Sequence, residues 1–303
     1  MSTGSSQNQT LSFLLRRFSE AGIKPRTKLG QNFLVDLNLV RLLVRSAELT
    51  PDDVVLEVGT GIGSLTALMA PEAAAVVTVE LDRQLFTLAQ EELASLENVT
   101  MLNTDALAGK NRLNPDVLDA VGRQLEAAPG RRLKLAANLP YNVATPIISN
   151  LLTLDRPPES MTVTIQKEVA DRIVAGPGSK DYGALSLWVQ SQCRVELVRV
   201  MSPTVFWPRP KVSSAIVRIV LEPERRAEIG DLAFFHSFVR SLFLHRRKVL
   251  RWGLLTAFEG RLDKPAVDLL MRRQDLPPDA RAEQLEPQRM LALAQAVHAQ
   301  LGD

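Results

Sequence analysis

Short apolar runs alternate with helical patterns through the first two thirds of this chain. The first run, Val54–Val58, ends in a glycine-rich turn, after which Leu65–Ala70 has a helical pattern. Later runs have the length and the β-branched content that strands favour. Seven strands are expected, at residues 54–58, 75–80, 99–103, 132–136, 163–166, 194–200 and 212–220. Because strands that alternate with helices form a mostly parallel sheet covered on both faces, the pattern predicts an α/β fold.

The last quarter of the chain has a different pattern. After a polar break at residues 221–226, each segment has helical periodicity and none has a strand pattern. We therefore expect a first domain at residues 11–223 and a smaller, all-helical C-terminal domain at residues 224–303. Residues 1–10 carry almost nothing to bury, so a disordered tail is predicted there.

The composition excludes several classes of protein. With 36 Lys and Arg against 34 Asp and Glu, the net charge is only +2, so nucleic acid must be held by local basic clusters. One cysteine, Cys193, excludes a disulfide framework, and the three histidines lack helical metal-ligand spacing. No apolar run approaches the roughly 20 residues that cross a bilayer, and the polar start is unlike a secretory signal. A cytoplasmic protein without a bound metal is expected.

A glycine-rich turn follows the first strand. Gly59, Gly61 and Gly63 permit a tight turn and let a ligand approach the backbone closely. The pattern also occurs in plain strand-to-helix turns, so it is weak by itself. Two acidic residues at later strand ends favour a ligand, because Glu80 suits ribose hydroxyls and Asp105 suits an adenine amino group. The combination predicts a site for an adenosine-containing cofactor.

Nicotinamide enzymes and methyltransferases that use S-adenosylmethionine share these features. The dinucleotide fingerprint has its third glycine at a position where this chain has Ser64. We therefore favour S-adenosylmethionine and keep an NAD-dependent oxidoreductase as an alternative.

The segment Asn138–Tyr141 follows the fourth strand. One reaction open to an S-adenosylmethionine enzyme is methyl transfer to an adenine amino group. That group is a poor nucleophile because its lone pair is delocalised into the ring. Two acceptors at its N–H groups favour a pyramidal nitrogen, and the Asn138 side-chain oxygen and the Leu139 carbonyl can supply them. Pro140 stiffens the turn, and Tyr141 offers a flat face for an extruded base. The alternative, a polar turn with a part-buried tyrosine, is disfavoured by the glycine-rich turn and the acidic residues.

Basic residues without intervening acids point to phosphate contact. The run 240–251 contains Arg246, Arg247 and Lys248 and no acid, and residues 197–221 contain a second such group with Arg209 and Lys211. A third group lies at residues 16–28. Such runs are usually solvated surfaces, but in a nearly neutral chain they predict RNA binding.

Several segments, in the same order, resemble the small-subunit ribosomal RNA adenine dimethyltransferase family (KsgA-type). The resemblance spans roughly residues 11–260. Its segments are Lys28–Leu34 with Asp36, Glu57–Thr66, Glu80–Asp82, Asp105–Leu107, Asn138–Pro146, Gln166–Ala170 with Tyr182–Gly183, Phe206–Ser213 and Arg246–Lys248. It implies a Rossmann-like class I methyltransferase fold with a mostly parallel seven-stranded sheet, followed by an RNA-contacting helical domain.

The family methylates two adjacent adenines near the 3′ end of small-subunit (16S) rRNA, twice each. The resemblance therefore implies an enzyme of small-subunit biogenesis that forms N6,N6-dimethyladenine. Its expected partner is rRNA within a ribosomal subunit or its precursor, with no membrane and no obligate protein partner. The cofactor-binding residues that it implies, with Gly61 of the glycine-rich turn, are Asn32, Leu34, Gly59, Gly61, Glu80, Asp105 and Asn138.

Some features stay open at this point. Phe206, in a proline-rich turn, either stacks on the target adenine, as the resemblance implies, or packs within the domain. His245 occupies an unexpected position before the basic run, and the long segment from Leu107 to Arg131 has no assigned role. A non-catalytic ribosome-assembly or nucleic-acid-binding factor on the same fold is a second alternative function.

Overall fold

The computed structural model describes residues 11–26, 29–110 and 112–302. The predicted tail at residues 1–10 and Lys28 lie outside the described residues. By their internal contacts, the described residues form two units, one from 11–170 with 196–220 and the other from 171–195 with 221–302. Among the helices described, none is both long and apolar enough to cross a membrane.

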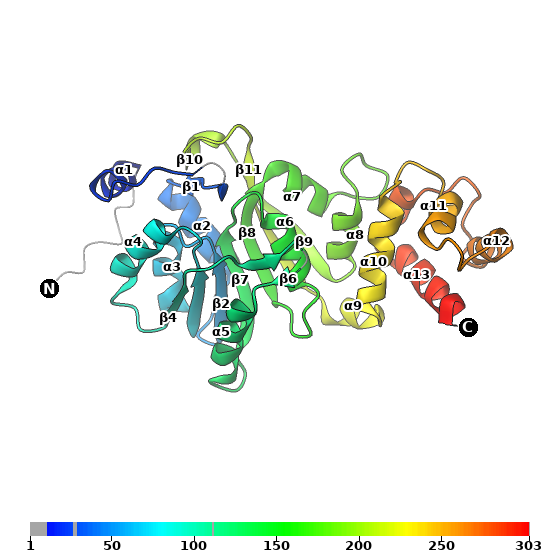
Figure 1. Cartoon of the computed structure of the whole chain (residues 1–303), viewed down its shortest axis with the longest axis horizontal. Helices are drawn as coiled ribbons and strands as arrows, with labels where there is room; N and C mark the ends of the chain where they lie inside the picture. Colours follow the sequence, from blue (N-terminus) through cyan, green and yellow to red (C-terminus); the bar gives the residue numbers. More distant parts are fainter. Residues whose placement is uncertain (1–10, 27–28, 111, 303) are drawn as a thin grey trace. The chain divides into compact units, whose positions relative to one another are not determined.

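A seven-stranded sheet forms the centre of the first unit (Figure 1). Its strand order is β4-β3-β2-β7-β8-β11-β9. The first five strands in that order pair in parallel, and β11 pairs antiparallel with β8. The strands are β2 (Asp53–Val58), β3 (Ala75–Val79), β4 (Val99–Leu102), β7 (Arg132–Asn138), β8 (Ser160–Gln166), β9 (Cys193–Met201) and β11 (Ser214–Leu221). The predicted mostly parallel, seven-stranded sheet is confirmed.

Helices cover both faces of this sheet, as the complete burial of β2 requires. On one face, α2 and α3 share an apolar cluster with Val55, Val76 and Ile216. On the other face, α5 packs against β2, β3 and β7 (Figure 1). The helices of this part of the chain are α2 (Leu37–Ala47), α3 (Ser64–Met69), η2 (Ala70–Glu72), α4 (Arg83–Leu93), α5 (Pro115–Glu126), α6 (Ala144–Leu151), α7 (Lys167–Val174) and η3 (Pro203–Val205).

Two short strand pairs were not predicted from the sequence. β5 (Leu107–Gly109) pairs with β6 (Arg112–Leu113), and β1 (Phe33–Leu34) pairs with β10 (Phe206–Trp207). The helix α1 (Leu11–Glu20) packs Phe18 edge-on against the rings of Phe33 and Trp207, at centroid distances of 5.2 and 5.3 Å. The segment before α2 thus packs against, and pairs with, the loop that precedes β11.

Helices dominate the second unit. They are α8 (Ala184–Gln190), α9 (Pro223–Glu228), α10 (Leu232–Phe243), α11 (Leu250–Ala257), α12 (Lys264–Arg273), η4 (Ala282–Gln284) and α13 (Pro287–Gly302). Their N-termini are partly fixed by side-chain caps, since Asp231 accepts a hydrogen bond from Phe234 N and Asp263 from Ala266 N.

Residues 171–195 group with this second unit although they include the start of β9 and are followed by β11. The Trp188 side chain on α8 is 1% exposed and lies 6.3 Å from the ring of Phe235 and 4.4 Å from that of His236. The Tyr182 hydroxyl donates to the Leu285 carbonyl at 2.8 Å. The predicted boundary at residue 223 is close to Leu221, where the chain re-enters this unit. A single boundary along the sequence assigns α8 to the first domain, whereas the contacts group it with the second unit. The division into a catalytic and an RNA-contacting domain stays a prediction.

The packing of α8 gives a testable expectation for stability. Trp188→Ala removes a large buried side chain from the second unit, so it should lower the free energy of unfolding by about 3–5 kcal/mol. Calorimetric melting measures the change, and Trp252→Ala is the matched control because Trp252 is 40% exposed. Equal melting temperatures for the two variants would contradict the assignment of α8 to this core.

Candidate active site

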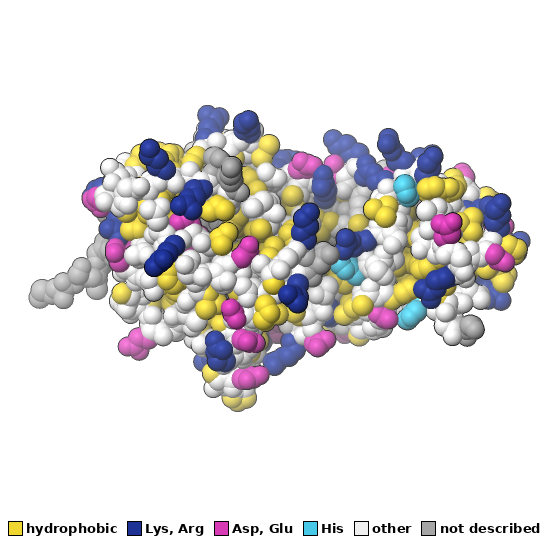
Figure 2. Space-filling model, in the orientation of Figure 1, with side chains coloured by type: hydrophobic (Ala, Val, Ile, Leu, Met, Phe, Trp, Pro, Cys, Tyr) yellow, Lys and Arg dark blue, Asp and Glu magenta, His cyan; other side chains and the backbone are white. Residues whose placement is uncertain are grey.

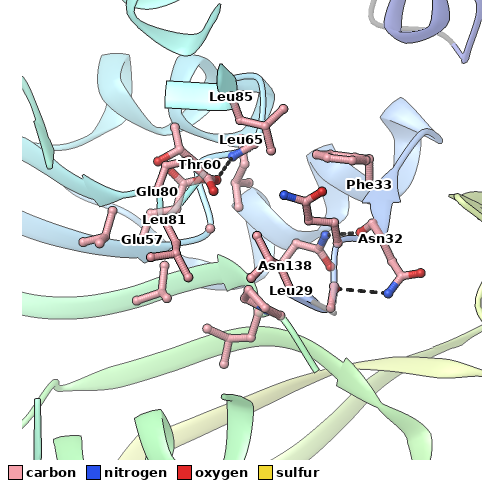
Figure 3. A pocket seen from close by; sticks show the side chains of 18 of the residues that line it. Leu29, Asn32, Phe33, Glu57, Thr60, Leu65, Glu80, Leu81, Leu85 and Asn138 are labelled. Carbon is pink, nitrogen blue, oxygen red and sulfur yellow. Dashed lines mark hydrogen bonds between the residues drawn. The ribbon is translucent and has the colours of Figure 1, made fainter. Parts of the chain in front are cut away.

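One pocket lies at the carboxyl ends of β2, β3, β4 and β7, the edge where open parallel sheets bind ligands (Figure 3). Segments widely separated in sequence line it, including residues 29–35, which precede α2. It brings together most of the site residues predicted from the sequence. Those that line it are Asn32, Leu34, Gly59, Gly61, Glu80, Asp105, Asn138, Leu139, Pro140 and Tyr141.

The glycine-rich turn approaches the segment that follows β7. Gly59 has φ of +90°, and a Cβ there would lie 3.2 Å from Cδ of Pro140. Gly61 has φ of +60°, and its Cβ would lie 3.3 Å from the Phe33 ring. Both positions have a left-handed backbone that L side chains rarely adopt, and an added Cβ would also have to displace a close neighbour slightly.

Glu80 follows β3 and is 6% exposed. Its Oε2 accepts a hydrogen bond from Gly61 N and its Oε1 from Asp82 N, both at 2.9 Å. Burial raises the pKa of Glu80, and these two backbone donors oppose that rise. A carboxylate oxygen accepts more than one hydrogen bond, so this geometry holds the group in place while leaving capacity for the hydroxyls of a ligand.

A chain of hydroxyl groups surrounds a second acid, Glu57, at the base of the pocket. Thr66 and Thr78 donate to Glu57 Oε2 at 2.5 and 2.6 Å, and Thr60 shares a hydrogen bond with Thr78 at 2.6 Å. Burial raises the pKa of Glu57 to about 8 although the hydroxyl donors oppose the shift. The network ties β2, β3, α3 and the glycine-rich turn together. Sequence reasoning missed Thr78, because only the register of β2 and β3 makes it a neighbour of Glu57.

The loop after β4 is held by Asn114, the N-cap of α5. Its Nδ2 donates to Thr104 Oγ1 at 2.9 Å and to the Asp105 carbonyl at 2.8 Å, while its Oδ1 accepts from Asp116 N. Asp105 Oδ1 itself accepts from Leu107 N at 2.9 Å. The long segment after Leu107, which had no assigned role, therefore fixes the loop that carries Asp105.

The orientation of the Asn138 amide is set by the segment before α2 (Figure 3). Asn138 Nδ2 donates to the Asn32 carbonyl at 2.9 Å, and Asn32 Nδ2 donates to the Gly30 carbonyl at 3.1 Å. Gly30, with φ of +69°, lies so close that a Cβ would be 2.9 Å from Asn142 Oδ1 and 3.2 Å from Tyr141 N. Because one N–H of Nδ2 is directed at the Asn32 carbonyl, the amide oxygen of Asn138 lies on the other side of the amide and is its acceptor for a ligand.

The residues after Asn138 are equally constrained. Leu139 has a buried side chain, and its N–H donates to the Thr164 carbonyl on β8 at 3.1 Å. The Tyr141 hydroxyl shares a hydrogen bond of 2.5 Å with Ser214 Oγ. Burial raises the pKa of Tyr141, and the Ser214 contact opposes that rise. Ser214 was not among the predicted site residues.

Phe206 packs within its own domain, which is one of the two alternatives expected from the sequence. It is 3% exposed, belongs to the apolar cluster with Val40 and Leu43, and pairs with Leu34 through β1 and β10. Phe206 is absent from the residues that line the pocket. Its stacking on a target base stays a prediction.

The basic residues predicted to contact RNA differ in their surroundings. Arg209 and Lys211 are exposed in the loop before β11 of the first unit, and Arg247 and Lys248 are exposed between α10 and α11 of the second. On the second unit, the face in Figure 2 has Lys and Arg side chains gathered along its upper edge. Arg246 instead donates to the carbonyls of Lys180 and Tyr182, at 2.8 and 3.2 Å. It is thus tied into its own unit.

Further basic residues of the three groups are engaged in ion pairs. Arg251 donates to both carboxylate oxygens of Asp268, at 2.5 and 2.9 Å, and Arg218 pairs with Glu48. The acids that pair with these two arginines come from other parts of the sequence. A run without acids therefore does not by itself predict which arginines are available to phosphate. Across the residues with described positions, no group of three or more His, Cys, Asp or Glu is arranged to hold a metal ion.

Comparison with known proteins identifies the relatives of this chain. Residues 22–296 match the family model described as ribosomal RNA adenine dimethylase. The chain is 39% identical over 271 residues to ribosomal RNA small subunit methyltransferase A of Lachnoclostridium phytofermentans, covering 89% of this chain and 90% of that protein.

Two solved structures share the fold at lower identity. A dimethyladenosine transferase from Plasmodium falciparum gives a TM-score of 0.73 at 21% identity, covering 88% of this chain and 97% of that chain. The 23S rRNA methyltransferase ErmE gives a TM-score of 0.61 at 24% identity, covering 88% and 99%. The predicted Rossmann-like class I methyltransferase fold is confirmed, and nothing in the comparisons supports an NAD-dependent oxidoreductase or a non-catalytic factor. The chain belongs to the ribosomal RNA adenine dimethylase family.

Proposed function

We propose that this protein transfers methyl groups from S-adenosylmethionine to the N6 amino groups of two adjacent adenines near the 3′ end of small-subunit rRNA. The products are N6,N6-dimethyladenines, formed in the cytoplasm within a ribosomal subunit or its precursor. Membership of the family makes the protein an rRNA adenine methyltransferase. The observation that supports the finer proposal is the fixed Asn138 amide beside the glycine-rich turn, in one pocket with Glu80.

The pocket residues fit S-adenosylmethionine by their chemistry. Glu80 presents carboxylate oxygens to ribose hydroxyls, and Asp105 presents an acceptor to an adenine amino group. Gly59 and Gly61 give the turn its left-handed backbone and its close approach to Pro140 and Phe33, which shapes this wall of the pocket. Glu57 is mostly protonated near neutral pH, because its pKa is about 8, and a cationic ligand nearby favours its ionised form.

The reaction depends on the orientation of the target amine more than on acid–base chemistry. S-adenosylmethionine, when bound, supplies a methyl group attached to a positively charged sulfur, and this sulfur is a good leaving group. The protein must therefore present a nitrogen lone pair along one line. Asn138 Oδ1 accepts one N–H of the target amine, because Nδ2 is held by Asn32, and the Leu139 carbonyl accepts from the other side. Tyr141 supports the face of the extruded base.

The exposed basic residues supply RNA affinity without sequence readout. Arg209 and Lys211 lie in the unit that holds the pocket, and Arg247 and Lys248 lie in the other unit. Phosphate contacts of this kind position an RNA and make its binding strongly dependent on salt.

Methyl-group mapping tests the proposed function directly. The protein is incubated with labelled S-adenosylmethionine and with undermethylated small subunits, and the modified bases are located by mass spectrometry of rRNA fragments. Two adjacent dimethyladenines near the 3′ end are expected. Large subunits serve as the control, and methylation confined to 23S rRNA would contradict the proposal.

Removal of the Asn138 amide tests its role. Asn138→Ala should lower kcat about 100- to 1,000-fold, because an acceptor aligned with the reacting amine is lost. RNA affinity should be retained. The matched control is Asn38→Ala, an exposed position outside the pocket, and unchanged methyl transfer by Asn138→Ala would refute the assignment.

An added methyl group in the glycine-rich turn tests the cofactor site. Gly59→Ala puts an L-residue at φ of +90° and a Cβ 3.2 Å from Pro140, so S-adenosylhomocysteine should bind at least about tenfold more weakly. Calorimetric titration measures this affinity. Gly109→Ala is the control, since its added Cβ meets nothing within 4 Å. Equal affinities of the two variants would place the ligand elsewhere.

Exposed basic residues and basic residues that hydrogen-bond within the protein should respond differently to substitution. The double variant Arg247→Gln/Lys248→Gln should weaken RNA binding and reduce the slope of log Kd against log salt by about 2. Arg246→Gln should instead lower the melting temperature, because Arg246 donates to carbonyls of its own unit. A salt slope that is unchanged in the double variant would exclude these side chains from the RNA contact.

A further inference from the structure

A hydroxyl pair links the pocket to strand β11. Tyr141 Oη and Ser214 Oγ are 2.5 Å apart, and the residues are separated by 73 positions in the sequence. Ser214 is fully buried, at 0% exposed, whereas Tyr141 is half-buried and lines the pocket with Asn138. This pair is therefore a contact between a core strand and a side chain at the reaction site.

The sheet fixes Ser214 relative to the segment Asn138–Tyr141. Ser214 opens β11 and is in register with Gln166 on β8, and Asn138 is in register with Thr164 on the same strand. The Leu139 N–H also donates to the Thr164 carbonyl. Both partners of the hydroxyl pair thus take their positions from β8, so the distance between them varies little.

Tyr141 needs such a partner because its ring can turn about two side-chain torsions. The backbone of the segment is fixed by Leu139 and by the close approach of Gly30 to Tyr141 N, but neither contact restrains the ring. The hydroxyl bond restrains it at the far end. Because burial raises the pKa of Tyr141, the phenol stays protonated over the physiological range and the bond persists.

We propose that Ser214 is a positioning residue, whose hydroxyl fixes the plane of the Tyr141 ring against which the target adenine lies. This role rests on the proposed function. Ser214 also follows Arg209 and Lys211 closely in the chain, so the ring is joined to a loop predicted to bind RNA phosphates. A base aligned by the ring reaches the Asn138 amide in a single orientation, which is needed at the transition state more than in binding.

The experiment is a double-mutant cycle with Ser214→Ala and Tyr141→Phe. Each single variant should lower kcat roughly three- to tenfold, the effect of one hydrogen bond, with KM for undermethylated small subunits changed less than about twofold. The double variant should be no slower than Tyr141→Phe alone, because both changes remove the same bond. Ser213→Ala, one position earlier and outside the hydroxyl pair, is the matched control and should keep wild-type kcat.

Stability and cofactor affinity separate positioning from folding. Melting temperature and S-adenosylhomocysteine affinity should be nearly equal for Ser214→Ala, Ser213→Ala and wild type. The role is overturned if Ser214→Ala keeps wild-type kcat, or if the two single losses multiply in the double variant. Either result with normal wild-type dimethylation leaves the proposed function standing, whereas absent wild-type dimethylation overturns the proposed function and this role with it.

Discussion

One hydrogen bond, from Asn138 Nδ2 to the Asn32 carbonyl, determines which atom of the Asn138 amide faces the pocket. A side-chain amide has a donor end and an acceptor end of nearly equal shape, and only the acceptor end can orient an amine lone pair. The donor end is engaged by a backbone carbonyl that lies 106 positions earlier in the chain. On either side of that carbonyl, Gly30 packs against Tyr141 and Asn142, and β1 pairs with β10.

The parallel sheet makes this arrangement possible. The carboxyl ends of β2, β3, β4 and β7 meet at one edge, so the glycine-rich turn, Glu80, Asp105 and Asn138 converge without any direct sequence proximity. Supporting polar contacts then fix each of them: hydroxyls around Glu57, Asn114 beside Asp105, and Ser214 on Tyr141. The site is thus formed on rigid elements and on loops with defined hydrogen bonds.

The sequence was sufficient for the sheet and for the residues at the strand ends, because each depends on local pattern. Gly59 and Glu80 follow apolar strands directly, so their position at the sheet edge follows from the fold class. The supporting residues were not predictable in this way. Thr78 contacts Glu57 only because β2 and β3 pair in one register, and Ser214 contacts Tyr141 only through the order of β7, β8 and β11. The inclusion of α8 in the second unit and the burial of Phe206 likewise depend on tertiary packing.

The most direct test of the account is the geometry of a ternary complex with S-adenosylhomocysteine and an adenosine-containing RNA fragment, determined by crystallography. We expect the N6 atom of one unstacked adenine within about 2.7–3.2 Å of Asn138 Oδ1, with Nδ2 still directed at the Asn32 carbonyl. An adenine bound outside the pocket, or an Asn138 amide whose nitrogen faces N6, would contradict it.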